Sequence, residues 1–260
     1  MQRIESMLAA GDWDAVERVR GGGEPAVARL RPFLSHEDDV VRLLAVDSIA
    51  AAGGPAAIGP LLAALRDDNE KVAVNAAYGL RGLPLQGRGP ALLLAYDAAW
   101  NPFVRAQIAL LLGLAGGPEV MEGLPRRITI ASAAPREALQ AAAARLGDID
   151  ARRAIADLLR DARGERIREL LDLVAYIGQS WLLRPLRPLL DRDEVAHNLS
   201  THRTRVVRRG KDLAVDAVLA IGRPPVAFQK ALHYDDEQVR QIALYLDSLP
   251  DELVDPRRPR

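Results

Sequence analysis

One segment of the chain gathers the residue types that could carry chemistry. Two histidines lie five residues apart among four arginines: His197, His202, Arg203, Arg205, Arg208 and Arg209. A helical metal-binding pair is spaced by four residues, and no carboxylate at a suitable spacing completes a ligand set here, so no metal site is predicted. Guanidinium groups bind carboxylates and phosphates. The segment is therefore interpreted as a contact for an anion or an acidic peptide.

A second interpretation of the same segment remains open. Asp191, Asp193 and Glu194 precede the arginines and would balance their charge in a solvated basic loop. The sequence does not separate a binding loop from this solvated one.

The sequence contains no motif that indicates another kind of chemistry. The chain has no cysteine, which excludes disulfides, thiolate zinc sites and cysteine nucleophiles. It also lacks a phosphate-binding glycine loop, a Gly-x-Ser-x-Gly elbow and a His-Glu-x-x-His pair. Trp13, Trp100 and Trp181 are predicted to pack across repeat edges rather than to stack on bases. No catalytic residue and no cofactor is predicted, and a non-enzyme is favoured.

Charge and hydropathy narrow the partner class. The chain has 35 basic and 35 acidic residues, whereas a nucleic-acid-binding surface normally leaves an excess of Lys and Arg. The N-terminal residues show no signal pattern, and no apolar run approaches the roughly 18 residues of a membrane span. We expect a cytoplasmic protein that binds another protein or peptide, with no membrane and no nucleic-acid partner.

The elements that would position these residues follow from a repeat. An apolar residue followed by arginine and then by aliphatics recurs, and the matching positions Val41, Val72, Val104, Pro135 and Ile167 are 31 or 32 residues apart. Gly-Pro clusters such as Gly53-Gly54-Pro55 and Gly116-Gly117-Pro118 end one helix and start the next. Each period therefore holds two short helices, such as residues 58–66 and 71–83, and strand alternation is not sustained anywhere.

Turn residues and prolines add detail to this pattern. Asp67, Asp68 and Asn69 suit the turn between the two helices and the cap of the second one. Prolines inside several first helices are predicted to kink them: Pro32, Pro60, Pro185 and Pro188.

From residue 24 to residue 249 the chain resembles the HEAT family, in particular the short bacterial HEAT-like repeats also found in phycobilisome lyases. The resemblance implies an all-α fold, an α-solenoid in which about seven antiparallel helix pairs form a right-handed superhelix. Residues 1–23 would form an N-terminal helical cap, residues 24–250 the repeat array, and residues 251–260 a frayed tail. Stacked repeats offer an extended surface and no pocket fixed by the fold.

The resemblance also implies that the second helices line the concave face. The predicted partner-binding residues on that face are Asp47, Tyr78, Arg81, Glu137, Glu169, Asp172, Tyr176, Asp216 and Tyr245, and Asp212 and Gln241 occupy equivalent open positions. The C-terminal half of this set is acidic, which would suit a partner that presents Lys or Arg.

The recurring arginines have a structural interpretation. Arg42, Arg105, Arg136, Arg168 and Arg240 occupy one repeat position. By resemblance, each is predicted to reach a turn aspartate or a carbonyl in the adjacent repeat rather than to bind phosphate, which would fix the repeat register.

One step breaks the period. The position that matches Ile167 in the next repeat is Gly210, 43 residues later. An insertion therefore lies at about residues 191–206, and insertions in one repeat often project from the binding face.

These observations favour a non-catalytic adaptor or scaffold that binds a protein through the concave face and the insertion, with an immunity or inhibitor protein as a subcase. Two alternatives rest on resemblance: a nucleic-acid-acting enzyme on a HEAT-like scaffold, of the DNA glycosylase type, and a bilin lyase subunit.

Overall fold

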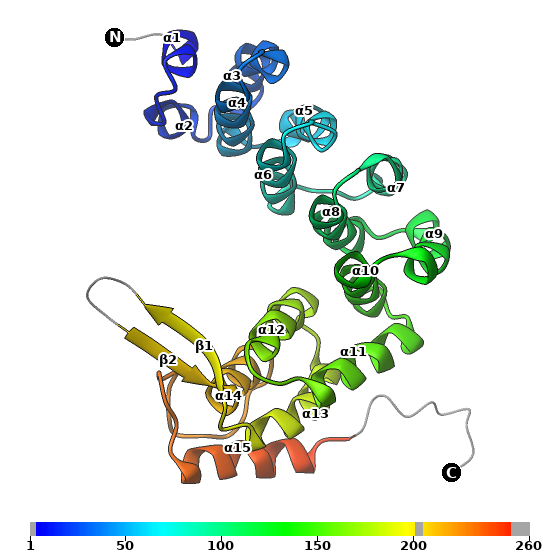
Figure 1. The fold of residues 1–260 in the computed structure, drawn as a ribbon, viewed down its shortest axis with the longest axis vertical. Helices are drawn as coiled ribbons and strands as arrows, with labels where there is room; N and C mark the ends of the chain where they lie inside the picture. The colour runs from blue at the N-terminus through cyan, green and yellow to red at the C-terminus, as the bar shows by residue number, and fades with distance from the viewer. Residues whose placement is uncertain (1–3, 201–204, 251–260) are drawn as a thin grey trace. The chain divides into compact units, whose positions relative to one another are not determined.

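The computed structural model describes residues 4–200 and 205–250, and nearly all regular structure in this part of the chain is helical (Figure 1). The chain divides into two compact units, residues 1–142 and 143–260, and the boundary falls within one helix. Helices stack on one another in chain order within each unit, so the predicted all-α solenoid is confirmed. The handedness of its superhelix stays a prediction.

The first unit is built from two layers of helices. Its elements, with η for a 3-10 helix, are α1 (Ile4–Ala9), α2 (Asp14–Val19), α3 (Gly23–Leu30), η1 (Arg31–Ser35), α4 (Asp39–Ala52), η2 (Pro55–Ala57), α5 (Ile58–Ala64), α6 (Glu70–Arg81), α7 (Gly89–Ala98), α8 (Pro102–Ala115), α9 (Pro118–Ile130) and the start of α10 (Ala133–Arg145). In Figure 1, α3, α5, α7 and α9 form one layer, and α4, α6 and α8 form the other. In the second layer, α4 packs against α2 and α6, and α6 packs against α8.

Prolines shape the first helices as the sequence predicts. Pro32 lies in η1, and Pro188 lies in a similar 3-10 helix of the second unit. Pro60 and Pro185 stand at the third position of short α-helices. Because proline has no N–H and clashes with the preceding turn, it is best tolerated in the first turn of a helix. The first helices are thus broken into short segments.

Side-chain caps start the second helices of the first unit. Asp38 Oδ1 accepts a hydrogen bond from the Val40 N–H at 2.8 Å, Asn69 Oδ1 accepts from the Lys71 N–H at 2.9 Å, and Asn101 Oδ1 accepts from the Phe103 N–H at 2.7 Å. Each cap satisfies one of the amide groups that a helix start leaves without a partner. The predicted role of the turn residue Asn69 is confirmed.

Aliphatic side chains fill the core between the layers. The largest fully buried ones include Leu44, Ile49, Leu61, Leu80, Ile108 and Leu111. Burying a side chain of this size contributes about 1.5–3 kcal/mol relative to leaving it exposed. Since no single repeat can enclose these side chains, the stacking of neighbours holds the unit together.

The second unit adds strands to the helices. After the end of α10 its elements are α11 (Ile149–Asp161), α12 (Glu165–Ile177), η3 (Ser180–Leu182), α13 (Leu183–Leu186), η4 (Arg187–Asp191), β1 (Val195–Ser200), β2 (Arg205–Arg209), α14 (Gly210–Ile221) and α15 (Asp236–Ser248). The second helices α12 and α14 pack against each other, and α14 also packs against η4 and α15.

The insertion forms a β-hairpin, which the sequence did not predict. β1 and β2 are antiparallel, with Asn198 opposite Val207, and an irregularity lies between Val195 and His197. The hairpin packs against α12 and α14. A two-stranded hairpin is marginally stable alone. Tertiary packing therefore supports strands that show no alternation of their own, which is why the prediction of no strands was wrong here.

The root of the hairpin is tightly packed at the start of α14. A Cβ atom placed on Gly210 would lie 2.7 Å from Ile167 Cδ1 and 2.8 Å from Arg192 Cβ. Such distances leave no room for a larger residue, so glycine is required for α14 to start against α12 and the hairpin.

The last predicted helix pair is incomplete. Residues 222–235, which we name the strap, contain no helix, and α15 follows without a first-helix partner. Gly222, Pro224 and Pro225 explain the absence, since consecutive prolines remove the donors that a helix needs. The last of the roughly seven predicted helix pairs therefore lacks its first helix.

No helix in the described part of the chain combines the length and the apolar character that crossing a membrane requires.

Candidate functional site

A groove of about 260 Å³ lies between α12 and α14 in the second unit. Its floor is apolar and consists of Leu171, Val174, Ala175, Leu213, Ala217, Ala220 and Ile221. Residues three or four apart share one face of a helix, which explains how each helix contributes several of them. The alanines are the smallest side chains on these faces, and their size leaves the space between the two helices open.

Four charged residues border this floor. Arg168 and Asp172 come from α12, Asp216 from α14, and Lys230 from the strap. Asp216 accepts hydrogen bonds from Arg208 Nη1 at 2.9 Å and from the Tyr234 hydroxyl at 2.7 Å, and Lys230 Nζ lies 3.6 Å from it. Within the described residues, Arg168 and Asp172 have no ion pair or side-chain hydrogen bond. The rim thus has an occupied carboxylate on one wall and unpaired charges on the other.

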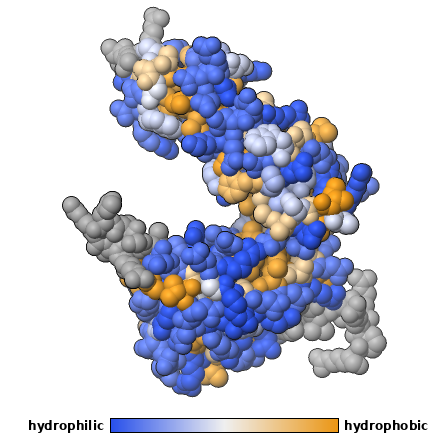
Figure 2. Space-filling view, in the orientation of Figure 1, coloured by the Kyte–Doolittle hydropathy of each residue, from blue (hydrophilic) through white to orange (hydrophobic). Residues whose placement is uncertain are grey.

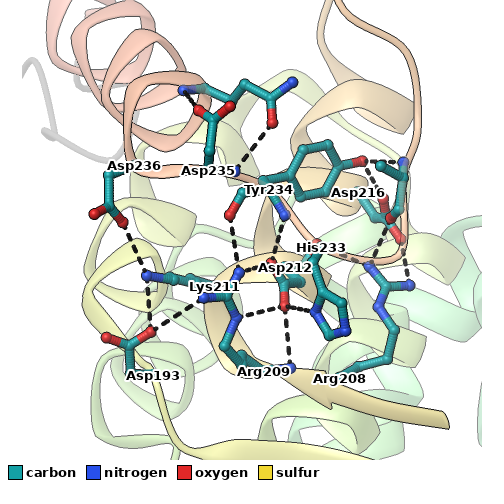
Figure 3. A network of polar contacts seen from close by, with 12 residues as sticks. Asp193, Arg208, Arg209, Lys211, Asp212, Asp216, His233, Tyr234, Asp235 and Asp236 are labelled. Atoms are coloured by element: carbon teal, nitrogen blue, oxygen red, sulfur yellow. Dashed lines mark hydrogen bonds and ion pairs between the residues drawn. The ribbon is translucent and has the colours of Figure 1, made fainter.

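A buried polar network fixes the α14 wall (Figure 3). Asp212, with no exposed surface, accepts hydrogen bonds from Arg209 Nε at 2.8 Å, from Arg209 Nη2 at 2.7 Å and from the Tyr234 N–H at 3.0 Å. His233 Nδ1 lies 3.0 Å from the same carboxylate. Burial alone would raise the pKa of Asp212, but the bonds from Arg209, His233 and Tyr234 outweigh it and hold the pKa well below its usual value. Asp212 is therefore an anion in the folded protein.

Arg208 and Tyr234 extend the network to the groove. Arg208 is 9% exposed, and its Nη2 donates to the carbonyls of Asp212 and Ala231 while its Nη1 pairs with Asp216. Burial and the hydrogen bond to Asp216 raise the pKa of Tyr234 to about 12, so its hydroxyl keeps its proton. The network thereby joins the hairpin, α14 and the strap.

A third set of contacts lies at the start of α14. Lys211 Nζ is 2.7 Å from Asp193 and 3.4 Å from Asp236. The hydrogen bond from Lys211 lowers the pKa of Asp193, and the same bond raises the pKa of Lys211. Asp193, which would balance the basic charge in the second interpretation of the insertion, pairs with Lys211 and lies 3.7 Å from Arg209.

The structure describes the side chains of three predicted insertion residues, His197, Arg208 and Arg209. Arg208 and Arg209 serve the internal network, because the strand that carries them lies against α14 and the strap. His197 is half-buried in β1. His202 and Arg203 lie outside the described residues, as does the side chain of Arg205. The prediction that Arg208 and Arg209 face a partner does not fit their burial and internal pairing.

The predicted concave-face residues of the second unit fall into three groups. Asp172 and Asp216 border the groove. Glu169 pairs with Arg166, and Tyr176 lies under Arg145, whose guanidinium carbon is 5.3 Å from the ring centroid. Tyr245 is half-buried on α15. The prediction that Asp212 is open was wrong, because Arg209 and the strap enclose it.

The remaining predicted residues belong to the first unit and to its second-helix layer. Asp47 of α4 accepts a hydrogen bond from Asn75 Nδ2 of α6 at 3.0 Å, and burial raises the pKa of Asp47. Arg81 lies 4.8 Å from the ring centroid of Tyr78 and donates to Gln107 of α8. Glu137 is half-buried in α10. These contacts link neighbouring repeats, and a partner-binding role for the residues stays a prediction.

The arginine ladder is confirmed at its first step. Arg42 Nε and Nη2 donate to the two oxygens of Asp67 at 2.9 and 3.0 Å, and Nη2 also donates to Asp68 at 2.9 Å. Asp67 lies in the turn of the next repeat. This pair keeps the pKa of Asp67 low although burial opposes it.

The later arginines of the ladder behave differently. Arg105 and Arg136 donate to the carbonyls of Ala99 and Ala131, which precede them in their own repeats. Arg240 pairs with Glu237 on the surface. Arg168 borders the groove, so the ladder prediction was wrong for it.

The tryptophan prediction also holds at one position only. Trp181 is buried, and Arg152 lies 5.4 Å from its ring centroid. Trp13 and Trp100 are 50% and 65% exposed. These two side chains do not pack across a repeat edge.

A larger groove of about 490 Å³ lies between the N-terminal ends of α4 and α6. Its polar groups are largely occupied by one another. Asn69 Nδ2 donates to Asp39, Asn101 Nδ2 donates to Glu70, and Asp68 accepts from Arg42. The α12–α14 groove differs because it combines an apolar floor with unpaired charges, which makes it the better candidate for a binding site.

The groove offers little for catalysis. No histidine, serine, threonine or tyrosine is among the described residues that line it. Asp216 already accepts from several donors, so it is poorly placed to act as a base. In residues 4–200 and 205–250, no three His, Cys, Asp or Glu side chains are grouped so as to hold a metal ion. The arrangement can bind a partner and shows no set of groups for a reaction.

Comparison with known proteins gives one match. Residues 10–81 match the family model described as HEAT repeats. This range runs from the end of α1 to the end of α6. No curated protein matches the chain. The match is to HEAT repeats in general, and the finer resemblance to phycobilisome lyases stays a prediction.

Proposed function

We propose that the chain is a non-catalytic protein-binding adaptor, because residues 10–81 match the model of HEAT repeats, which generally serve as protein-interaction scaffolds. The partner inserts apolar side chains into the α12–α14 groove of the second unit. The hairpin and the strap support this groove, and Arg208 of the insertion contributes through its internal pair with Asp216 rather than through a contact with the partner.

The observation that carries the proposal is the apolar floor beneath an unpaired charged rim. The face of the molecule in Figure 2 is mostly hydrophilic, with hydrophobic residues in separate patches. A concave apolar site with a few polar groups is the usual form of a binding pocket. Partner side chains that bury this floor would gain about 25 cal/mol for each Å² of apolar area removed from water.

The size of the groove favours a protein partner over a small molecule. Sites for drug-sized ligands measure roughly 300–1,000 Å³, whereas this groove has about 260 Å³. That volume suits one or two large side chains of a longer segment. The rest of the binding area would then come from the surrounding helices, because a stable protein interface extends well beyond one pocket.

The test is a peptide-display selection on the full chain, followed by affinity measurements with variants. Ala220 is exposed on the α14 side of the groove, so Ala220→Phe fills the groove without crowding the core. Ala91→Phe places the same side chain on an exposed position of α7 in the first unit and is the matched control.

We expect peptides that bind the wild type and the Ala91→Phe variant equally and lose about tenfold or more in affinity for Ala220→Phe, the size of effect expected when a central contact is blocked. Ala175→Phe, on the opposite wall, should act in the same way. Binders that ignore both groove variants, or the absence of any binder, would overturn the proposal.

A further inference from the structure

We infer that the segment that occupies the α12–α14 groove is acidic and amphipathic: its apolar side chain rests on the floor, and its carboxylates pair with Arg168 and Lys230. This inference rests on the proposed function and specifies the chemistry of the partner. It reverses the sign of charge that the sequence of the concave face suggests.

The reversal follows from which carboxylates are already paired. Asp212 is enclosed and bound by Arg209, and Glu169 pairs with Arg166. Asp216 accepts from Arg208 and from Tyr234. A carboxylate that already holds a guanidinium and a hydroxyl attracts a further cation weakly. Asp212 and Asp216 are therefore neutralised by residues from the hairpin and the strap, and Glu169 is neutralised by Arg166 of its own helix.

The cations of the rim are more available. Lys230 is 74% exposed in its side chain, and its distance of 3.6 Å from Asp216 is too long for a good hydrogen bond. Arg168 is exposed and has no partner among the described residues. Asp172 is the rim carboxylate without a partner in the same part of the chain. Two available cations against one available anion favour a partner with excess negative charge.

The geometry of the rim favours carboxylates on a peptide over a nucleic acid. A nucleic-acid strand presents a regular line of phosphates and requires a continuous basic track. Here the two cations are separate and stand beside the unpaired carboxylate of Asp172, which would repel a phosphate chain. Separate carboxylates on a helix or an extended segment can instead contact Arg168 and Lys230 on opposite walls while avoiding Asp172.

The floor determines the apolar part of the partner. Ala175, Ala217 and Ala220 form a shallow surface without a deep aromatic slot. Aliphatic side chains such as Leu or Ile fit this shape and this volume. The expected motif is thus one or two aliphatic residues flanked by Asp or Glu.

Two labelled peptides of 12 residues test the inference by fluorescence anisotropy with the full chain. One has Leu at helical spacing with Glu between, and its twin has Lys in place of every Glu. We expect the Glu peptide to bind about tenfold or more tightly than the Lys twin, in line with charge-pair effects at interfaces. Higher salt should weaken the preference.

A charge reversal sharpens the comparison. In the double variant Arg168→Glu with Lys230→Glu, the preference should invert, so that the Lys twin binds more tightly. The matched control reverses two arginines away from the groove, Arg160→Glu on α11 and Arg240→Glu on α15, both of which form surface ion pairs. This control should keep the preference of the wild type.

The outcomes separate the inference from the proposed function. If the Lys twin binds the wild type more tightly, and Ala220→Phe blocks it, the groove binds peptides but the acidic partner is wrong. The acidic partner is equally wrong if selected peptides depend on the groove while the Glu peptide does not bind. If single-stranded DNA displaces the Glu peptide through Arg168 and Lys230, the site accepts polyanions in general, and the inference is overturned.

Discussion

The two units of the chain fix the relative positions of their helices with different arrangements of hydrogen bonds and ion pairs. In the first unit, several polar contacts join a turn or helix face to its equivalent in a neighbouring repeat, as in the Arg42–Asp67 pair and the Asn69–Asp39 bond. In the second unit, the polar groups converge on one point, where Asp212 and Asp216 of α14 hold the hairpin and the strap. The contacts of the first unit recur from one repeat to the next, whereas the network of the second unit occurs where the repeat is interrupted by the hairpin and the strap.

The difference has a consequence for function. The contacts that recur along the first unit pair its turn residues with one another. They leave few unpaired charges in the groove beside α4 and α6. In the second unit, the insertion brings Arg208 to Asp216 and the strap brings Lys230 to the rim. The hairpin and the strap thus determine the charge at the rim of the α12–α14 groove, while α12 and α14 provide its apolar floor.

The largest expected effect is at Asp212. Replacing Asp212 by Asn removes the charge that Arg209 and the buried network require, and breaking a buried ion pair on one side costs about 3–5 kcal/mol. Chemical denaturation should show this loss, and hydrogen exchange should place it in α14 and the hairpin. Asp236→Asn is the control, since the Asp236 side chain is 98% exposed and its loss should leave stability unchanged. Equal effects of the two changes would contradict the central role of the network.

The same residue predicts a pH dependence. The pKa of Asp212 is lower in the folded chain than in the unfolded one, so the unfolded state binds the proton more readily. The stability from Asp212 is therefore complete above the unfolded pKa of about 3.9 and is lost as pH falls through the lower folded pKa. The difference in unfolding free energy between wild type and Asp212→Asn should shrink as the pH falls below about 4. A difference that stays constant into acid would contradict the assignment.

A smaller effect is expected at Asp67 in the first unit. Asp67→Asn weakens two charge-assisted bonds from Arg42, at a cost of about 2 kcal/mol. Arg42 keeps Asp68 as a partner, which is why the loss should be smaller than at Asp212. Hydrogen exchange should place the loss in α4 and α6. Asp68→Asn, at a 94% exposed position, is the control and should cost at most about 0.5 kcal/mol.

Periodicity explains how much of the fold the sequence predicts. The recurring apolar-arginine positions located the second helices, and Asp67 and Asn69 were correctly assigned to turns and caps. Local spacing suffices for these features, because each helix is defined by its own apolar face and its own terminal residues.

The candidate site was predicted only in part, for a physical reason. Asp172 and Asp216, predicted on the open side of the second helices, both border the α12–α14 groove, since the position of a residue on a helix follows from spacing. Whether Asp212 is enclosed or Asp216 is neutralised depends on Arg208, Arg209 and Lys230, which come from the hairpin and the strap. Pairing between segments with no common period is a tertiary property, and the neutral overall charge gave no sign of it.

The smallest expected effect separates capping from register in the first unit. Asn101 caps α8 through its carbonyl oxygen and donates to Glu70 of the previous repeat through its amide nitrogen. Asn101→Ala loses both and should cost about 1 kcal/mol, the usual value of a cap. Asn101→Asp keeps the cap but places a carboxylate beside Glu70, so it should recover only part of that loss, and more of it at high salt, which screens the repulsion. Full recovery at low salt would show that the bond to Glu70 contributes nothing to register, and the contrast between the two units would then rest on the Arg42–Asp67 pair alone.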